Sequence, residues 1–538
     1  MQYDYIVIGA GSAGSIIASR LSESTTKSVL LLEGGPDYPN FENLPSDVKF
    51  GYSTGTDLAV GDEHDWGYTG HVGSRPETFE RLLRLPRGKI TGGTSSINGQ
   101  IFLRGLSHDF NEWNNYGISG WNYSDVLPFF RKLETDLDFS GDFHGTNGPI
   151  LAKRFPKEEW TRPQVGFHRA CQEAGYPAVD DFNLPDAQGV GPFPCNNPRG
   201  IRLSTSLGYL TDSRHRMNLT IREKCTVKRI LLEKKRAVGV ELESGGQPFI
   251  VEGANIILSA GALADPHILM LSGIGPAGHL LDNGIPCVLD LPGVGENLRD
   301  HPQNFVTASV FDKNTLDTKK PRLQVGLRYT AENSQNTDDM LMWMGSYAVS
   351  GDYREILPEN ARNLKTSSIG YGSTSQSDLI GIQITISLYF ATSSGTVRLT
   401  KENPSEFPQV TLNLLDSQED VEKMSHGVRL AHSIMKSEAL SEIVKDVLTP
   451  SEDLLNDNHL LASWLRQNTT TGNHLTSSCS MGNRKNPMSV VDENCRTHGI
   501  GNLFIADASV MPNTVRANTN VTTMMIGEKL SDFLKESD

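Results

Sequence analysis

The chain has 538 residues, of which 37% are hydrophobic and 21% charged, and its formal net charge is −15. This composition predicts a globular protein with large cores and excludes a disordered, collagen-like or coiled-coil chain. The acidic balance argues against nucleic acid or an anionic membrane surface as the main partner. Six cysteines without a C-x-x-C pair predict reduced thiols in a cytoplasmic protein. No apolar run approaches the ~18 residues of a membrane span, and we expect neither such a span nor a metal site.

The chain begins with a strand, a helix and a second strand. Asp4–Ile8 is rich in β-forming side chains, Ser12–Glu23 has helical spacing, and Ser28–Glu33 is a second β-rich run, which together predict a βαβ unit. Residues 34–85 follow as a long excursion rich in Gly, Pro, Asp and Ser, and 137–215 is similarly irregular. Strand and helix signals return twice, with strands at 218–222, 227–232, 237–242 and 256–259 and a helix at 265–272, then a strand at 503–506 and a final amphipathic helix at 522–535.

The stretch from about 303 to 470 has a different pattern. In Leu379–Tyr389 the even-numbered positions from 380 to 388 are apolar and the residues between them are small or polar, which predicts a strand with one buried face. Antiparallel sheet plus helices predicts a second domain here. Its other predicted elements are strands at 396–400 and 409–415 and helices at 421–435 and 459–467.

A glycine motif joins the first strand to the first helix. Gly9, Gly11 and Gly14 form G-x-G-x-x-G around Ser12 and Ala13, and Glu33 ends the second strand 19 residues after Gly14. The first glycine permits a tight turn, the second lets backbone approach a pyrophosphate, and the third lets helix and strand pack closely. The Glu33 carboxylate can accept hydrogen bonds from ribose hydroxyls and would repel a 2′-phosphate. The motif predicts FAD or NAD, without choosing between them, and disfavours NADP.

Further segments carry a family resemblance. The segment 88–98 (GKITGGTSSIN) resembles the first signature of the glucose–methanol–choline family of FAD oxidoreductases, and 261–275 (GALADPHILMLSGIG) resembles the second. More landmarks follow in the family's order at 292–302 (PGVGENLRDHP), 506–512, 517–520 and 525–529. The resemblance spans nearly the whole chain and is closest to the choline oxidase and the aryl-alcohol or hydroxymethylfurfural oxidase branches.

The resemblance implies an α/β protein, α+β overall, with a Rossmann-like FAD-binding domain and a substrate domain of antiparallel sheet plus helices. The expected FAD-binding domain comprises 1–155, 205–302 and 478–538, and the expected substrate-binding domain comprises 156–204 and 303–477. By motif match, the resemblance implies that Gly92, Gly93, Ser95 and Asn98 lie along the FAD. It also implies that the backbone of Val227 contacts the adenine, and that Asp507 and Ala508 lie near the pyrophosphate, ribityl chain or ring.

The chain departs from the family pattern at a few positions. Ile97 stands where the choline oxidase pattern has a flavin-linking histidine, so we expect FAD bound without a covalent link. Thr91 replaces an aliphatic residue, and Asp265 replaces Ser or Thr, with no evident chemical consequence. Ser477-Ser478 replaces the usual Gly-Thr and bears on local backbone geometry.

The segment 473–482 (NHLTSSCSMG) resembles the family stretch that carries the catalytic histidine, so His474 is the expected base for the alcohol proton. Asn518 falls on the family's second catalytic position, where its amide can donate to the alkoxide oxygen. Asn520 and Thr522 lie at the start of the last helix. The resemblance implies that the N-terminus of this helix points at the flavin C2 carbonyl. His301 and His498 also lie near family landmarks and are interpreted as structural.

The resemblance implies oxidation of a primary alcohol to an aldehyde, with hydride transfer to flavin N5 and with oxygen or another acceptor taking the electrons. The strand 303–311 has no Asp or Glu, whereas the choline-oxidising members need a carboxylate there, so an uncharged aromatic, furanic or aliphatic alcohol is expected. Asn473 precedes the expected base, where the family often has an aromatic residue, so a more polar substrate is also an open alternative. Met342 and Met344 are candidates to line an apolar pocket, although their spacing also fits an ordinary strand.

Several alternatives remain from sequence. The same scaffold hosts a lyase that binds FAD without redox turnover and a light-driven fatty-acid decarboxylase. An alcohol dehydrogenase with an acceptor other than oxygen, a nicotinamide dehydrogenase that shares only the first motif, and a flavin-binding protein without catalysis are also open. We expect a monomer or a homodimer.

Overall fold

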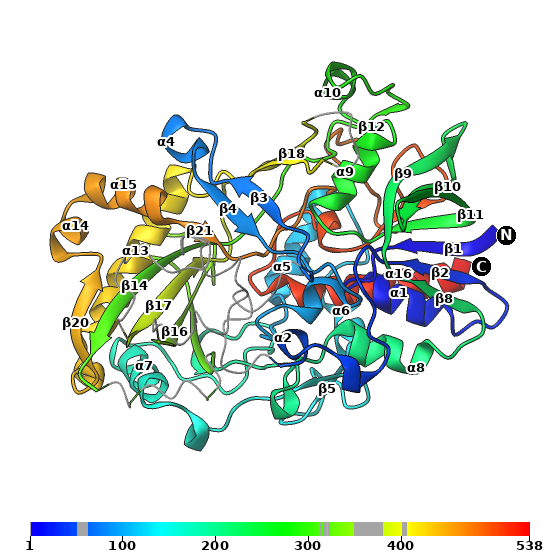
Figure 1. The fold of residues 1–538 in the computed structure, drawn as a ribbon. Coiled ribbons are helices and arrows are strands. Elements are labelled where there is room, and N and C mark those ends of the chain that lie inside the picture. Colours follow the sequence, from blue (N-terminus) through cyan, green and yellow to red (C-terminus); the bar gives the residue numbers. More distant parts are fainter. Residues whose placement is uncertain are drawn as a thin grey trace.

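A computed structural model describes residues 2–50, 63–312, 315, 320, 323–348, 380–400 and 406–537. Three sheets organise the fold, and the two large ones stand at opposite ends of the molecule in Figure 1. Both chain termini lie at the end that carries the first sheet. Within the described ranges no helix is long and apolar enough to cross a bilayer.

The first sheet is built from strands far apart in the sequence. Its order is β8-β2-β1-β11-β10-β9, with β22 beside β11. The strands β8, β2, β1, β11 and β22 run parallel, and β10 and β9 add an antiparallel edge. Their bounds are β1 Gln2–Ile8, β2 Val29–Leu32, β8 Leu219–Arg222, β9 Cys225–Glu233, β10 Arg236–Ser244, β11 Gln247–Leu258 and β22 Leu503–Ile505. The Rossmann-like sheet that the sequence predicted is therefore present.

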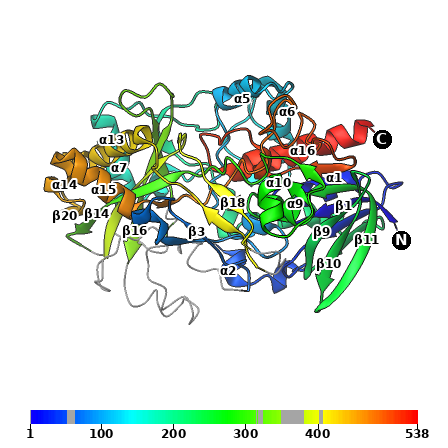
Figure 2. The same ribbon diagram turned by 90° about the horizontal axis from the view of Figure 1, so that it is seen from above.

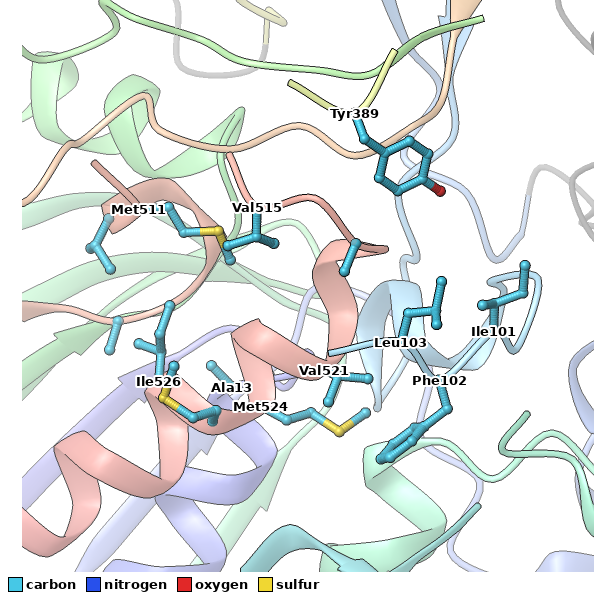
Figure 3. Close-up of a cluster of buried hydrophobic side chains, with 14 of the residues drawn as sticks. Ala13, Ile101, Phe102, Leu103, Tyr389, Met511, Val515, Val521, Met524 and Ile526 are labelled. Atoms are coloured by element: carbon cyan, nitrogen blue, oxygen red, sulfur yellow. The ribbon is translucent and has the colours of Figure 1, made fainter. Parts of the chain in front are cut away.

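One helix packs on this sheet, and the carboxy-terminal helix packs closely on that helix. The helix α1 (Gly14–Leu21) is buried along most of its length, and α16 (Thr519–Ser537) packs against it. Gly527 makes this approach possible, because a Cβ there would lie 3.0 Å from the carbonyl oxygen of Ala13. Figure 3 shows Val521, Met524 and Ile526 of α16 among the apolar side chains of this core.

The second sheet is antiparallel, as predicted for the substrate domain. Its order is β20-β14-β17-β16-β15-β7, with β21 beside β14. The helices α13 (Gln418–Met435) and α7 (Arg162–Glu173) pack against it, while α14 (Glu452–Asn456) and α15 (Asn458–Asn468) lie beyond α13. The strands are β7 Gly189–Pro192, β14 Pro302–Val310, β15 Val325–Tyr329, β16 Met340–Ala348, β17 Ile380–Leu388, β20 Val444–Thr449 and β21 Thr470–Thr471.

The sequence predicted that the strand at 379–389 has one buried face. Leu379 lies outside the described residues, and for the remaining residues this prediction is wrong. Apolar side chains of β17 such as Ile386 pack on α13, where a Cβ at Gly427 would lie 2.6 Å from Ile386. The opposite face is also buried, with Gln383 and Thr385 each only 3% exposed. The polar face is buried because other parts of the folded protein cover it, and part of it, at Thr385, borders a cavity.

A small four-stranded sheet connects the two ends of the molecule. Its order is β18-β19-β3-β4, with bounds β3 Tyr68–His71, β4 Leu82–Leu85, β18 Thr396–Arg398 and β19 Gln409–Thr411. The predicted excursion 34–85 therefore contributes a hairpin, and the predicted strands at 396–400 and 409–415 pair with it instead of joining the second sheet. Figure 1 shows β3 and β4 between the two large sheets.

The remaining elements are short and lie mostly around the first sheet. Their bounds are α2 Ser46–Lys49, α4 Pro76–Phe79, α5 Ser107–Trp113, α6 Tyr123–Leu133, β5 Glu134–Asp136, β6 Ile150–Ala152, α8 Thr211–Ser213, α9 Ala264–Leu271, β12 Ile274–Gly275, α10 Ala277–Asp282 and β13 Leu289–Asp290.

A buried charge cluster fixes the start of the irregular segment 137–215. His144 contacts Asp181 at 2.9 Å and Asp136 at 3.2 Å. Arg154 pairs with both aspartates, and Arg104 pairs with Glu134. Burial alone would lower the pKa of His144, but its hydrogen bonds to the surrounding carboxylates outweigh burial and raise the pKa to about 10. Glu134, Asp136 and His144 have metal-like spacing, but the arginine and histidine cations already balance the carboxylates.

Candidate active site

A cavity of about 430 Å³ runs from the first sheet towards the second. It begins at the carboxyl ends of the parallel strands: Gly9 follows β1, Glu33 follows β2, Ser259 follows β11, and Asp507 lies two residues beyond β22. In open α/β sheets, ligands bind in the crevice outside these strand ends. Its far end reaches Phe305 of β14, Trp343 of β16 and Thr385 of β17.

The three glycines of the first turn have different surroundings. Gly9 has a φ of +94°, and a Cβ there would lie 2.5 Å from the carbonyl oxygen of Ser259. A Cβ at Gly14 would collide with the carbonyl oxygen of Gly9. At Gly11 the space is open, since the nearest atom to a Cβ is the Cα of Gly93 at 4.0 Å. The turn thus leaves room over Gly11 beside the start of α1, as a bound pyrophosphate requires.

Glu33, just after β2, and Val227 of β9 both border the cavity. The carboxylate of Glu33 accepts hydrogen bonds from the backbone N–H of Ala10, at 3.0 Å, and of Gly35, at 2.9 Å. Burial raises the pKa of Glu33 to about 7 in spite of these bonds. Each carboxylate oxygen keeps a second lone pair, so the carboxylate can still accept from a ribose hydroxyl.

The start of α16 carries two polar atoms without a partner. Asn520 accepts a hydrogen bond from the hydroxyl of Ser12 at 2.7 Å through Oδ1, while its Nδ2 is buried and unpaired. The Oγ1 of Thr522 is also buried without a partner. Asn520 borders the cavity, so a ligand with acceptor atoms at this helix start would satisfy its amide. Together with the open space over Gly11, these atoms fit FAD.

Most of the residues expected along FAD border the cavity, namely Gly9, Gly11, Ser12, Ala13, Glu33, Gly93, Asn98, Val227, Asp507, Ala508 and Asn520. Four others do not: Gly14, Gly92, Ser95 and Thr522. Gly14 lies against the Gly9 carbonyl, and Gly92 makes a turn with a φ of +94°. The Ser95 hydroxyl is turned to the Gly92 carbonyl, and Thr522 is buried within α16, so Thr94 and Thr523 border the cavity in their places.

The unusual residue Asp265 forms a buried carboxyl pair with Asp507. Asp265 accepts hydrogen bonds from the Ala260 N–H at 2.8 Å and from the Ser509 hydroxyl at 2.9 Å. Asp507 accepts from the N–H groups of Gly261, at 2.6 Å, and of Ser509, at 2.8 Å. Burial and then the charge of Asp507 raise the pKa of Asp265 well above its usual value. A protonated Asp265 can donate a hydrogen bond, as the family's Ser or Thr hydroxyl can.

His474 and Asn518 meet at the cavity wall. The Nδ2 of Asn518 lies 3.0 Å from Nε2 of His474, and the Tyr389 hydroxyl donates to Oδ1 of Asn518 at 3.4 Å. Burial, together with the cation of Arg87, lowers the pKa of His474 to about 3. The imidazole is therefore neutral at neutral pH. The two residues that the sequence assigned to catalysis are 44 positions apart in the chain and adjacent here.

A second histidine, His301, which the sequence analysis interpreted as structural, lies against His474. Nδ1 of His301 lies 2.9 Å from Nδ1 of His474, and the His301 ring stacks on Tyr389 with centroids 4.2 Å apart. The preceding residue, Asp300, accepts hydrogen bonds from the backbone N–H of His301, at 2.8 Å, and of His474, at 2.9 Å. The Asp-His pair in the 292–302 landmark was the available signal, but its proximity to His474 is a property of the tertiary structure.

The wall beyond His474 is mixed in character. Phe305, Thr385 and Trp343 lie side by side on neighbouring strands, because Thr385 pairs with both of the others. Gln303 borders the cavity and lies against Gly472, two residues before the base, since a Cβ at Gly472 would lie 3.2 Å from its Nε2. Arg87 donates from Nη2 to the carbonyl oxygen of Asn473 at 2.9 Å, and its Nε is buried without a partner.

The suggestion that Met342 and Met344 line the pocket is wrong. Both methionines are fully buried on the same face of β16 as Met340, which packs against α13. Trp343 lies on the opposite face and borders the cavity. A strand alternates its side chains between two faces, so one apolar run cannot serve both the helix-covered core and the cavity.

Ser477 shows what its departure from the family pattern means. Its φ is +70°, in the left-handed region where a glycine is normally found. The Ser477 hydroxyl donates to Oγ1 of Thr476 at 3.0 Å inside the protein. The backbone of the histidine segment therefore keeps the glycine-type turn although glycine is absent.

The fold and the site define a class of protein: a dinucleotide-binding oxidoreductase whose cofactor cavity is bordered by a histidine. The chain belongs to the GMC oxidoreductase family, whose amino-terminal model matches residues 3–303 and whose carboxy-terminal model matches residues 391–527. It is thus an FAD-dependent oxidoreductase that acts on CH–OH donors.

Relatives and solved structures agree with this assignment. The chain is 32% identical to an oxygen-dependent choline dehydrogenase of Photobacterium profundum, over 99% of this chain and 93% of that protein. It is 34% identical to an oxygen-dependent choline dehydrogenase of Vibrio vulnificus, over 99% and 94% of the two chains. The crystal structure of pyridoxine 4-oxidase from Mesorbium loti superposes with a TM-score of 0.88 at 25% identity, covering 99% of both chains.

Proposed function

We propose that this enzyme oxidises a primary alcohol to an aldehyde, with His474 as the base and Asn518 as the donor to the substrate oxygen. One observation carries the proposal: Nε2 of His474 and Nδ2 of Asn518 lie 3.0 Å apart at the cavity wall. An alcohol oxygen within hydrogen-bond reach of both atoms, replacing their direct contact, would give its proton to Nε2 and accept a hydrogen bond from Nδ2. FAD, when bound, supplies the acceptor for the hydride that leaves the alcohol carbon.

Each residue then has a separate task. Neutral His474 forms the new N–H bond while the alcohol O–H bond breaks, and Asn518 stabilises the negative charge that develops on the oxygen. Asn518 cannot act as the base, because an amide has no basic site near neutral pH. The buried start of α16 lies beside both residues and favours negative charge at the cofactor.

Replacing His474 by Ala tests the base assignment. We expect anaerobic flavin reduction by alcohol to slow by a factor of about 10²–10⁴, because the proton acceptor is lost. The control is His459→Ala, on the exposed surface of α15, which should reduce at the wild-type rate. Near-normal reduction in His474→Ala would overturn the assignment. If the wild type left its flavin oxidised with every alcohol, a lyase or a photodecarboxylase would be the better interpretation.

We further propose that the substrate is an uncharged alcohol and not choline, despite the names of the relatives. Gln303 of β14 is neutral and borders the same cavity as His474, and the cation of Arg87 acts on His474. A quaternary ammonium at this end of the cavity would meet no carboxylate at position 303, and the nearby Arg87, which has Asp300 and Asp65 as neighbours, adds no attraction. A substrate screen in which choline exceeded all aryl and alkyl alcohols would reject this proposal.

The link to FAD is proposed to be non-covalent. Ile97 borders the cavity and is only 5% exposed, and an aliphatic side chain cannot bond to the flavin. Heat or acid denaturation should therefore release FAD into the supernatant. A yellow precipitate with a colourless supernatant would contradict this.

We propose the two domains expected from sequence, supported by the composition of the two large sheets. All strands of the first sheet lie in 1–155, 205–302 and 478–538, and those of the second sheet lie in 156–204 and 303–477 except for Pro302 at the start of β14. The small sheet joins both regions.

Oxygen as acceptor, a cytoplasmic location consistent with six unpaired cysteines, and a monomer or homodimer also remain proposals. Peroxide yield in air and light scattering test the first and the last.

A further inference from the structure

We infer that His301 is a positioning residue that fixes the tautomer of His474, so that Nε2, next to Asn518 at the cavity wall, carries the lone pair. The inference rests on the proposed function, because it matters only if His474 is the base. His301 itself does not border the cavity and is fully buried, so it acts through His474 and not on the substrate.

The direction of each hydrogen bond follows from the first one. The Tyr389 hydroxyl donates to Oδ1 of Asn518, so the Nδ2 of Asn518 is the group that faces Nε2 of His474. An amide nitrogen can only donate, and therefore this Nε2 carries no hydrogen. The hydrogen of neutral His474 must then be on Nδ1, where the partner at 2.9 Å is Nδ1 of His301.

The far side of His301 completes the chain. Its Nδ1 accepts the hydrogen bond from His474, so the hydrogen of neutral His301 is on Nε2 and is donated to Oγ1 of Thr514 at 2.9 Å. Burial and the neighbouring His474 lower the pKa of His301 well below its usual value, which keeps it neutral and able to accept. Asn518, His474, His301 and Thr514 thus form a single consistent series of donors and acceptors.

The backbone holds both rings in this arrangement. The carboxylate of Asp300 accepts from the N–H of His301 and from that of His474, and it is also bonded to the Thr471 hydroxyl. When Nε2 of His474 takes the alcohol proton, Nδ1 keeps its own hydrogen, and the new positive charge is stabilised by the Nδ1 of His301 and by this carboxylate. No proton needs to leave the pair in this step. A neutral imidazole here takes the place that a carboxylate has in a Ser-His-Asp triad.

Two nearly isosteric variants separate this role from simple packing. In His301→Asn the Oδ1 atom stands close to the position of Nδ1 and can accept from His474, whereas in His301→Leu no acceptor remains. Both variants lose the bond to Thr514 equally. We expect His301→Leu to reduce its flavin about 10²-fold more slowly with an unchanged substrate Kd, and His301→Asn to recover most of the rate. A larger solvent isotope effect on flavin reduction is expected only in His301→Leu, because proton transfer becomes limiting there.

A measurement on the wild-type holoenzyme tests the tautomer without any loss of activity. With ¹⁵N-labelled histidine, long-range ¹H–¹⁵N correlation spectra should show His474 protonated at Nδ1, its signal being assigned by its absence from His474→Ala. Protonation at Nε2, or equal rates in His301→Leu and wild type, would overturn the inference and leave the base assignment standing. Normal flavin reduction in His474→Ala would instead refute the proposed function itself.

Discussion

Replacing Gly11 by Ala separates cofactor binding from folding. A Cβ at Gly11 meets only the Cα of Gly93, at 4.0 Å, which is an ordinary van der Waals distance, and its φ is outside the left-handed region. The fold therefore accepts the methyl group, and the stability of the cofactor-free protein should stay level or rise by about 0.4–1 kcal/mol.

The same methyl group projects into the space that the proposed pyrophosphate occupies. Overpacking a close contact costs about 1–3 kcal/mol. The Kd for FAD should therefore rise by a factor of roughly 5 to 150. The assay is titration of the cofactor-free protein with FAD, followed by the quenching of flavin fluorescence, next to a thermal melt of both cofactor-free proteins.

Gly14→Ala is the matched control, because it adds the same methyl group three residues later. There the Cβ collides with the backbone carbonyl of Gly9, so this variant should lose about 1–3 kcal/mol of stability before any cofactor is added. An unchanged Kd for FAD in Gly11→Ala with an unchanged melt would refute the view that FAD passes over Gly11.

Three further predictions concern substrate selection, the hydrogen bond from Asn518 to the substrate oxygen, and the dependence of stability on pH. Gln303→Glu should lower the KM for choline by about tenfold or more, since it places a carboxylate near the base; a choline KM that stays unchanged while other alcohols are still oxidised would show that position 303 does not select the substrate. Asn518→Ala should slow flavin reduction about 10²-fold with FAD retained, and a wild-type rate would remove Asn518 from the mechanism. His144 has a pKa raised to about 10, so its stabilising charge is complete below pH 6.5 and is lost as the pH rises towards 10. The Tm should fall over that range, less steeply in His144→Gln, and parallel curves would contradict this assignment.

The sequence by itself determined the features that depend on local spacing. The turn from Gly9 to Gly14 forms between β1 and α1 because three glycines at fixed positions permit the turn and the close packing of helix on strand. His474 and Asn518 were predicted from the resemblance of short segments to family motifs. The alternation in 380–388 predicted a strand correctly, because its period of two is local, but not that both of its faces are buried.

Only the tertiary structure decided which distant segments meet. His301 and His474 are 173 residues apart, and no local pattern places their Nδ1 atoms 2.9 Å from each other. The pairing of β3 with β19 and the covering of the polar face of β17 depend likewise on how the whole chain buries its surface. That Trp343 and not Met342 borders the cavity depends on which face of β16 the helices cover. Alternation defines the two faces of a strand but does not say which face packs against the helices.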